Sequence, residues 1–208
     1  MLAIIACELY DSIVDKLKTF KVLKILIYKV YIGFIYKRLK IRRKESMPIV
    51  LARVDERLVH GVTVNQWNRA LNPKRYMVVD DEISENEMIK STMRMSKPSG
   101  TGMSIINTQT AIANFNAGKY DSHTVFVLVK QPETLLKMLK GGVEIPAVDL
   151  GAMFERDQRK PFSSRIALDE KEIADLEEIK KLGVSVYAQY TPEEEKVELD
   201  DLLTKGGK

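Results

Sequence analysis

Cysteine and histidine are scarce in this sequence, and their scarcity excludes several kinds of site. The 208 residues include one cysteine, Cys7, so the chain by itself forms neither an internal disulfide nor a cysteine-based metal site. This composition fits a reducing cytoplasm. The two histidines are His60 and His123, which excludes a metal site built from several histidines. Chemistry that depends on an imidazole must use one of these two residues.

The glycine-rich turns that bind nucleotides are also missing. None of the 11 glycines stands in a G-x-G-x-x-G or G-x-x-x-x-G-K-[ST] pattern, and the sequence contains no G-x-S-x-G motif. A dinucleotide site, a P-loop and the nucleophile elbow of a hydrolase are therefore not supported. The sequence also has no internal repeat and no low-complexity segment.

Charge is divided unevenly along the chain. The whole sequence has a net charge of +4, but residues 1–46 carry +7 and residues 47–208 carry −3. The larger part is thus mildly acidic, and its composition gives no argument for a nucleic acid as partner. The contrast predicts a basic, apolar N-terminal extension, residues 1–46, followed by one folded domain, residues 47–208.

Three interpretations of the extension stay open. Its apolar stretch, residues 22–36, is interrupted by Lys24 and Lys29, each of which costs about 2.5–3.5 kcal/mol at the centre of a spanning helix. The basic residues that follow would suit an anionic lipid surface. The extension is a misassigned translation start with Met47 as the true beginning, a peripheral amphipathic helix, or a weak membrane anchor.

Short apolar runs alternate with helical segments from Met47 onward. Strands are predicted at residues 49–54, 76–79, 103–106, 123–129, 145–150, 165–168 and 184–190, and helices at residues 62–70, 84–95, 108–116, 132–140 and 169–182. Ser84 with Glu87, and Asp169 with Glu172, have the spacing of capping boxes. The alternation predicts an α/β fold with a mostly parallel open sheet of about six or seven strands and helices on both faces.

Polar residues follow the predicted strands at the edge where parallel α/β sheets bind ligands, the carboxyl ends of the strands. These residues are Asp55, Arg57 and His60 after the first strand, Asp80 and Asp81 after the second, Asn107 and Thr108 after the third, Lys130 and Gln131 after the fourth, and Arg156, Arg159 and Lys160 in the loop that starts at Gly151 after the fifth. The residues after the first strand are the ones whose side chains best suit a chemical reaction. Imidazole is a nucleophile near neutral pH, and arginine binds phosphate through two N–H groups. A helix N-terminus just after His60 would attract an anion, and Asp55 could orient the imidazole or the arginine.

Each of these residues also has a plainer interpretation. His60 could be a surface or helix-capping residue, and Asp55 could be an ordinary turn acid. Arg53 alternates with its neighbours along the strand and could be solvated. Lys130 could act only through its charge.

Outside this turn, we expect structural roles. His123 begins an apolar strand, and Asp80 with Asp81 forms a solvated strand end more simply than a metal site. The loop with Arg156, Arg159 and Lys160 is either a soluble connection or a patch that docks a partner.

The turn resembles a known family motif. Residues 53–61, RVDERLVHG, with Trp67 downstream, are similar to the R-[IV]-D-[DE]-R-L-[IV]-H-G…W opening of IIB subunits in the mannose/fructose/sorbose family of the sugar phosphotransferase system. The resemblance continues through VVDDE at 78–82, LVKQP at 128–132 and VDLGAM at 148–153. It covers residues 47–203 and leaves residues 1–46 without a counterpart.

The resemblance implies a phosphocarrier enzyme. His60 would accept a phosphoryl group on its δ nitrogen from the phosphohistidine of a IIA domain and pass it to a sugar during uptake through the IIC and IID membrane subunits. Arg57 would stabilise the group and Asp55 would support the loop, with Arg53, Gly61 and Lys130 at the phosphate or substrate edge. No metal, nucleotide or other cofactor is expected. The protein would be cytoplasmic and peripheral to the membrane through IIC and IID.

Two other functions are compatible with the same residues. The rival functions are a regulatory phosphoprotein that uses the same histidine without moving sugar, and a small-molecule-binding α/β module. The sequence does not specify the sugar, and it leaves a homodimer open. Many family members have Gln-Val where this chain has Val62-Thr63, and a second glycine where it has Ala152. Neither change affects the nucleophile, but both could alter partner or sugar preference.

Overall fold

The computed structural model describes residues 47–156 and 158–205. The predicted N-terminal extension, with its apolar stretch and Cys7, lies outside the described residues. The division of the chain after residue 46 therefore stays a prediction. Within the described residues, no helix is both long enough and apolar enough to cross a bilayer.

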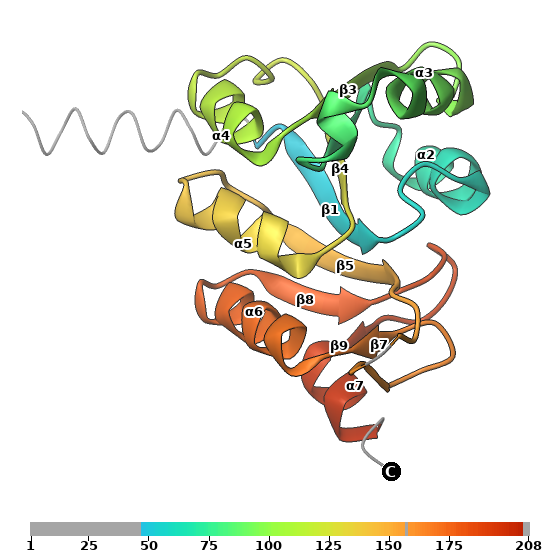
Figure 1. Cartoon of the computed structure of the whole chain (residues 1–208), viewed down its shortest axis with the longest axis vertical. Helices are drawn as coiled ribbons and strands as arrows, with labels where there is room; N and C mark the ends of the chain where they lie inside the picture. Colours follow the sequence, from blue (N-terminus) through green and yellow to red (C-terminus); the bar gives the residue numbers. More distant parts are fainter. Residues whose placement is uncertain (1–46, 157, 206–208) are drawn as a thin grey trace, which may run out of the picture. The chain divides into compact units, whose positions relative to one another are not determined.

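A seven-stranded sheet forms the centre of the described domain (Figure 1). In spatial order its strands are β3 (Gly102–Ile106), β2 (Arg75–Val79), β4 (Val125–Val129), β1 (Ile49–Asp55), β5 (Ala147–Ala152), β8 (Ser185–Ala188) and β9 (Val197–Glu198). The first six strands run parallel, and β9 pairs antiparallel with β8. The predicted mostly parallel sheet is confirmed. Because β1 lies between β4 and β5, residues at its carboxyl end are near the middle of the ligand-binding edge.

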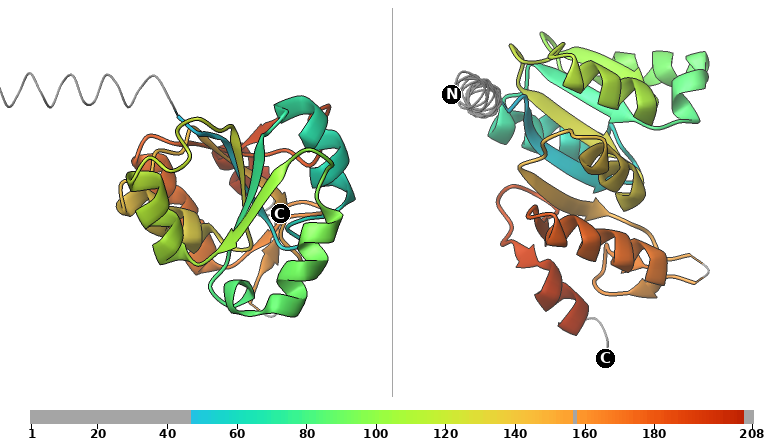
Figure 2. Two further views of the ribbon diagram at one scale, coloured as in Figure 1. Left: turned by 90° about the horizontal axis from the view of Figure 1, so that it is seen from above. Right: turned by 90° about the vertical axis from the view of Figure 1, so that its left-hand side faces the viewer.

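Helices cover both faces of the sheet, as predicted (Figure 2). They are the π-helix η1 (Val62–Trp67), α2 (Asn68–Leu71), the 3-10 helix η2 (Ile83–Glu85), α3 (Glu87–Ser96), α4 (Thr108–Asn116), α5 (Pro132–Lys140), α6 (Glu170–Lys181) and α7 (Leu199–Lys205). The helices α4, α5 and α6 lie on one face, and α2 and α3 lie on the other.

The apolar core is correspondingly divided between the two faces. Along β4, Val125, Val127 and Val129 pack with residues of α4, α5 and α6, whereas Phe126 and Leu128 pack in a second cluster. The second cluster includes Leu58 and Trp67 from the turn and helix that follow β1. Burial on both faces explains why the strands are nearly continuous apolar runs.

Two local predictions need correction. Helix α3 begins after Asn86, whose side chain accepts a hydrogen bond from Ile89 N at 3.1 Å, while Ser84 lies in the preceding 3-10 turn. The predicted Ser84–Glu87 capping box is therefore wrong, because the nearer Asn86 is itself a good cap. The box formed by Asp169 and Glu172 is confirmed.

The predicted strand at residues 165–168 also needs correction, because it touches the main sheet through a single parallel bridge, between Ile166 and Met153 just after β5. Its second half, β7 (Ala167–Leu168), pairs antiparallel with β6 (Lys160–Pro161) in a separate two-stranded sheet. The seventh strand of the main sheet is instead β9, which comes from the C-terminal tail, where no strand is predicted.

Candidate functional site

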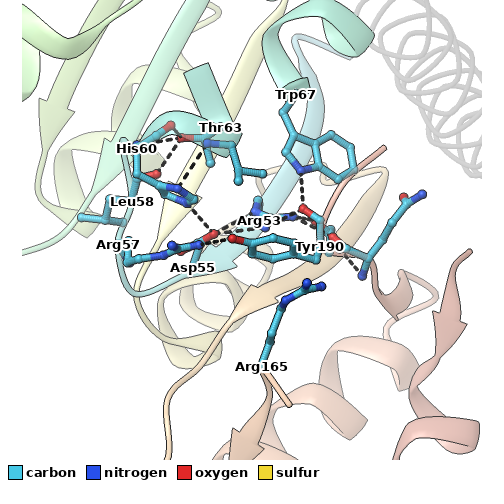
Figure 3. Close-up of polar contacts among 12 residues, drawn as sticks. Arg53, Asp55, Arg57, Leu58, His60, Thr63, Trp67, Arg165 and Tyr190 are labelled. Atoms are coloured by element: carbon cyan, nitrogen blue, oxygen red, sulfur yellow. Dashed lines mark hydrogen bonds and ion pairs between the residues drawn. The ribbon is translucent and has the colours of Figure 1, made fainter. Parts of the chain in front are cut away.

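The turn after β1 holds His60 through local hydrogen bonds (Figure 3). Leu58 takes the left-handed conformation, with φ of 52°, and its side chain is buried in the core. The N–H of His60 donates to Thr63 Oγ1 at 2.9 Å, and the Thr63 hydroxyl donates to the carbonyl oxygen of Leu58 or His60. The buried Thr63 thus joins the turn to the first turn of η1, which Trp67 anchors in the core.

Asp55 orients the imidazole of His60. The His60 Nε2 atom lies 2.9 Å from Asp55 Oδ2, and the Asp55 side chain is fully buried. A carboxylate is an acceptor, so this contact assigns the ring proton to Nε2. The other ring nitrogen, Nδ1, accepts a long hydrogen bond from Val62 N at 3.4 Å. Nδ1 is therefore the unprotonated ring nitrogen, and its lone pair faces the Val62 N–H group.

Arg53 lies beneath this pair and is completely buried. Two of its N–H groups donate to Asp55 Oδ2 at 3.2 and 3.1 Å, and the others donate to the Asp149 carboxylate and the backbone oxygens of Gln189 and Tyr190 at 2.8 and 3.2 Å. All five donors of the guanidinium are therefore occupied. The interpretation of Arg53 as solvated is wrong, and its predicted place at the phosphate edge gains no support because no donor is left for a phosphate.

The two carboxylates that share Arg53 differ in their titration. Burial by itself would raise the pKa of Asp55, but its hydrogen bond with His60 and the nearby charge of Arg53 outweigh burial and hold this pKa below its usual value. Asp55 is therefore ionised at neutral pH. For Asp149, burial raises the pKa to about 7 even though the Arg53 charge opposes the shift.

We predict that Asp149 makes the folded domain less stable as the pH rises. Its pKa is about 7 in the folded protein against a usual value of 3.8, so the folded state keeps a proton that the unfolded chain has released. The resulting stabilisation is complete below pH 3.8 and is lost as the pH approaches about 7. We expect unfolding by urea, measured from pH 4 to pH 8, to show this decline in the wild type but not in Asp149→Asn. Parallel curves for the two proteins would contradict the raised pKa.

Arg57 lies at the exposed rim of the site. Its backbone N–H donates to Asp55 Oδ1 at 3.1 Å, and its Nε atom is 3.8 Å from the same oxygen. Its Nη2 atom donates to the hydroxyl of Tyr190 at 3.0 Å. The side chain is 38% exposed, so the guanidinium can meet a group that arrives from solvent.

The remaining predicted site residues are placed less centrally. Lys130 is 36% exposed and its Nζ atom lies 3.2 Å from Asp80 Oδ2, so it belongs to a separate ion pair. Gly61 is in a right-handed helical conformation with open space around it, and nothing there requires a glycine. His123 precedes β4, at the end of the sheet opposite the carboxyl ends, where Nδ1 is 3.2 Å from Ser122 Oγ.

The aspartates after β2 bind the backbone rather than remaining free. Asp80 Oδ1 accepts from Ile83 N at 2.8 Å, and Asp81 Oδ1 accepts from the N–H and hydroxyl of Thr108 at 2.7 and 2.8 Å. Asp81 is exposed and Asp80 half-buried, so the pair is a partly solvated strand end that also fixes the backbone next to it. In the part of the chain that the structure describes, no group of three or more residues is arranged to hold a metal ion.

The loop after β5 is attached to the site by an ion-pair network. Arg159 is buried and donates to Glu56 Oε1 at 2.6 Å and to Glu172 Oε2 at 2.9 Å, and Arg156 pairs with Glu56 at the surface. The interpretation of Arg159 as part of a soluble loop is thus wrong, because it connects the turn after β1 to the start of α6. Lys160 is exposed.

No role was predicted from the sequence for Thr63, Asp149, Gly151 or Tyr190. Asp149 had a readable signal, since an acid inside a buried apolar strand requires a charged or hydrogen-bonding partner. The signal for Gly151 appears only in three dimensions: a Cβ atom there would lie 2.1 Å from the Arg53 guanidinium. Tyr190 is 133 positions from Arg57 and has no local motif.

The described domain is a mostly parallel α/β domain that presents an oriented imidazole and a rim arginine at the carboxyl ends of its strands. The model of the PTS system sorbose subfamily IIB component family matches residues 49–208. The chain belongs to this family, and it is a IIB phosphocarrier component of sugar transport, a sugar phosphotransferase. The predicted family is confirmed.

Individual relatives agree with the family assignment. The chain is 28% identical over 159 residues to the PTS system sorbose-specific EIIB component of Klebsiella pneumoniae. The matched residues make up 76% of this chain and 97% of that protein. The crystal structure of the IIBSor domain of the sorbose permease from the same organism superposes with a TM-score of 0.73, at 28% identity and over 76% of this chain and 97% of the other. The PTS system mannose-specific EIIAB component of Escherichia coli K12 is 28% identical over 161 residues, 77% of this chain but 50% of the relative.

Proposed function

We propose that His60 is the phosphorylated residue of this IIB component and that it carries the phosphoryl group from a IIA domain to a sugar. The observation that carries this proposal is the 2.9 Å contact between His60 Nε2 and the buried Asp55 carboxylate. That contact leaves the Nδ1 lone pair available for attack. It also places a negative charge beside the ring, where it stabilises the positive charge that develops as Nδ1 bonds to phosphorus.

The transfer from IIA to His60 and the transfer from His60 to the sugar each exchange one bond to phosphorus for another, so neither needs a cofactor. In the first, the Nδ1 lone pair attacks phosphorus, and the bond from phosphorus to the IIA histidine breaks with its electron pair returning to that ring. In the second, a sugar hydroxyl oxygen attacks the phosphorus on His60, the N–P bond breaks, and the hydroxyl proton leaves to a base. The Val62 N–H, which faces Nδ1, would meet the incoming oxygens, and the Arg57 guanidinium would neutralise part of their charge.

The partners follow from the same proposal. The name of the mannose-specific relative, EIIAB, combines IIA and IIB, which supports a IIA domain as phosphoryl donor for this chain. Transfer onto a sugar in transit would need the membrane subunits IIC and IID, and this protein would then be cytoplasmic and held at the membrane by them. Phosphorylation of sugar by membranes that contain IIC and IID would separate this carrier from a purely regulatory phosphoprotein.

Mapping the phosphoryl group tests the proposal. The protein is incubated with phosphoenolpyruvate, the general phosphotransferase components and a cognate IIA domain, and the label is located by peptide mass spectrometry and phosphorus NMR. We expect one acid-labile, base-stable phosphoryl group, on Nδ1 of His60. A label on His123, on a carboxylate or on Nε2 of His60 would contradict the assignment.

Replacing Arg57 is expected to slow the transfer without preventing it. In Arg57→Ala, the transferring group loses a charge-assisted donor, and we expect the single-turnover rate from phospho-IIA to fall by about 10- to 100-fold. Arg57→Lys should recover part of this loss, because it keeps the charge but not the fork of two donors. Arg69→Ala, at an exposed arginine of α2, is the matched control and should leave the rate unchanged. Equal rates for Arg57→Ala and Arg69→Ala would remove Arg57 from the mechanism.

A further inference from the structure

Tyr190 makes a set of contacts with the site that the proposed function does not use. It follows β8, and its ring lies between two arginines (Figure 3). The Arg165 Cζ atom lies 3.7 Å from the ring centroid and the Arg57 Cζ atom lies 5.6 Å from it. The Tyr190 hydroxyl accepts from Arg57 Nη2 at 3.0 Å. Among the described residues, Arg57 is the one hydrogen-bond partner of this hydroxyl.

The backbone of Tyr190 is fixed to the buried centre of the site. Its carbonyl oxygen accepts from Trp67 Nε1 at 3.1 Å and from Arg53 Nη2 at 3.2 Å. The segment that follows is tied as well, because the Gln189 side chain donates to backbone oxygens of Pro192 and Glu194 at 3.2 and 2.7 Å. The ring of Tyr190 therefore projects from a rigid base.

The Arg165 side chain holds the other face of the ring. Its Nη1 atom lies 3.1 Å from both carboxylate oxygens of Glu194, which keeps the guanidinium over the aromatic ring. A guanidinium stacked on a ring at this distance is a favourable cation–π contact. The Tyr190 hydroxyl is thus presented at a defined position beside Arg57.

The Tyr190 hydroxyl is the one hydrogen-bond partner of the Arg57 guanidinium among the described residues. Apart from Tyr190, this guanidinium has a 3.8 Å contact with Asp55 Oδ1 and a distant one with the Phe154 ring, whose centroid is 5.9 Å away. A long side chain that is 38% exposed would otherwise sample many rotamers. Fixing such a side chain before the reacting group arrives lowers the entropy lost at the moment of transfer.

We propose that Tyr190 is a positioning residue for phosphoryl transfer, which acts by holding the Arg57 guanidinium at the rim of the His60 site. This inference rests on the proposed function of His60 and Arg57. It assigns a role to a residue at the end of β8, 130 positions along the chain from His60. Tyr190 acts through Arg57 and does not itself touch the phosphoryl group.

A double-mutant cycle tests the proposal. Tyr190→Phe removes the hydroxyl and keeps the ring stacked on Arg165. We expect it to lower the maximal single-turnover rate from phospho-IIA by roughly 3- to 10-fold, with little change in the half-saturating IIA concentration. In the Arg57→Ala background, Tyr190→Phe should have no further effect, because the group that it positions is absent. Tyr187→Phe is the matched control, since the Tyr187 hydroxyl makes no hydrogen bond within the described part of the chain.

Two results would overturn the proposal. One is a wild-type maximal rate in Tyr190→Phe. The other is the same fold-loss from Tyr190→Phe whether Arg57 is present or replaced, which would indicate a general structural effect. The position of the phosphoryl group is mapped in every variant, so that a failure of the proposed function can be told apart from a failure of the role of Tyr190. A phosphoryl group found away from His60 refutes the proposed function, whereas a group on His60 without coupling between Tyr190 and Arg57 refutes only the role of Tyr190.

Discussion

Replacing His60 with alanine is expected to abolish phosphorylation of this protein by phospho-IIA. The imidazole supplies the attacking nitrogen, and no other side chain at the rim of the site can replace it: Asp55 is buried beneath the ring and Arg57 is a cation. Removal of a covalent nucleophile costs enzymes on the order of 10⁴-fold or more in rate. The measurement is the transfer of radiolabelled phosphate from phospho-IIA, which should fall to background in His60→Ala.

The controls for this prediction come from the chain itself. His123→Ala removes the other histidine of the described residues, at the opposite end of the sheet, and should leave the labelling intact. His60→Ala is also expected to stay folded, because Asp55 retains its hydrogen bonds from Arg53 and from the backbone of Arg57. Cooperative unfolding of the variant checks this point. Labelling that survives in folded His60→Ala would contradict the assignment of His60 as the nucleophile.

Replacing Gly151 with alanine is expected to unfold or severely destabilise the domain. An added Cβ atom would lie 2.1 Å from both Cζ and Nη2 of Arg53, well inside any contact distance. The guanidinium cannot move away, because all five of its N–H groups are bonded in a fully buried setting. Displacing it would break a buried ion pair, which costs about 3–5 kcal/mol. That is a large part of the roughly 5–15 kcal/mol that stabilises a typical domain.

Gly61→Ala is the matched control for this substitution. Gly61 has a right-handed helical conformation, and the one side-chain atom near an added Cβ would be Asn65 Nδ2 at 4.0 Å. We expect its free energy of unfolding to be unchanged or about 0.5–1 kcal/mol higher, because alanine restricts the unfolded chain. Both variants are compared with the wild type by urea unfolding followed by circular dichroism. A Gly151→Ala protein as stable as Gly61→Ala would show that Arg53 is not confined as its contacts indicate.

The predictable parts of this fold are those with short-range signals. The apolar runs of β1, β2 and β4, separated by helix-length segments, predicted parallel strands because each run is buried on both faces. The capping box of α6 depends on two residues three positions apart, and it was predicted correctly. Ser84 and Asn86 are both good N-cap residues, so the sequence did not specify which of them begins α3. In the folded protein the cap is Asn86.

The residues of the candidate site were likewise predictable where they lie close together in the sequence, and not where their partners lie on distant strands. Asp55, Arg57 and His60 lie within six positions, so a motif and a strand end were enough to group them. Arg53 was misjudged because alternation along a strand was taken to mean one solvated face, whereas β1 lies in the middle of a sheet covered on both sides. An arginine in that position must be buried, and a buried charge needs partners that only distant strands supply.

The sequence by itself determined the parallel α/β fold, the family and the histidine of greatest interest, because these depend on periodicity and on neighbours along the chain. Only the tertiary structure decided how Arg53, beneath that histidine, is held. Asp149 from β5 and Gln189 and Tyr190 after β8 meet Arg53 across intervals of about a hundred residues or more. No local pattern encodes such contacts, since they arise when β1, β5 and β8 are placed side by side in the sheet. The burial of Arg53 and the contact between Tyr190 and Arg57 both follow from that placement.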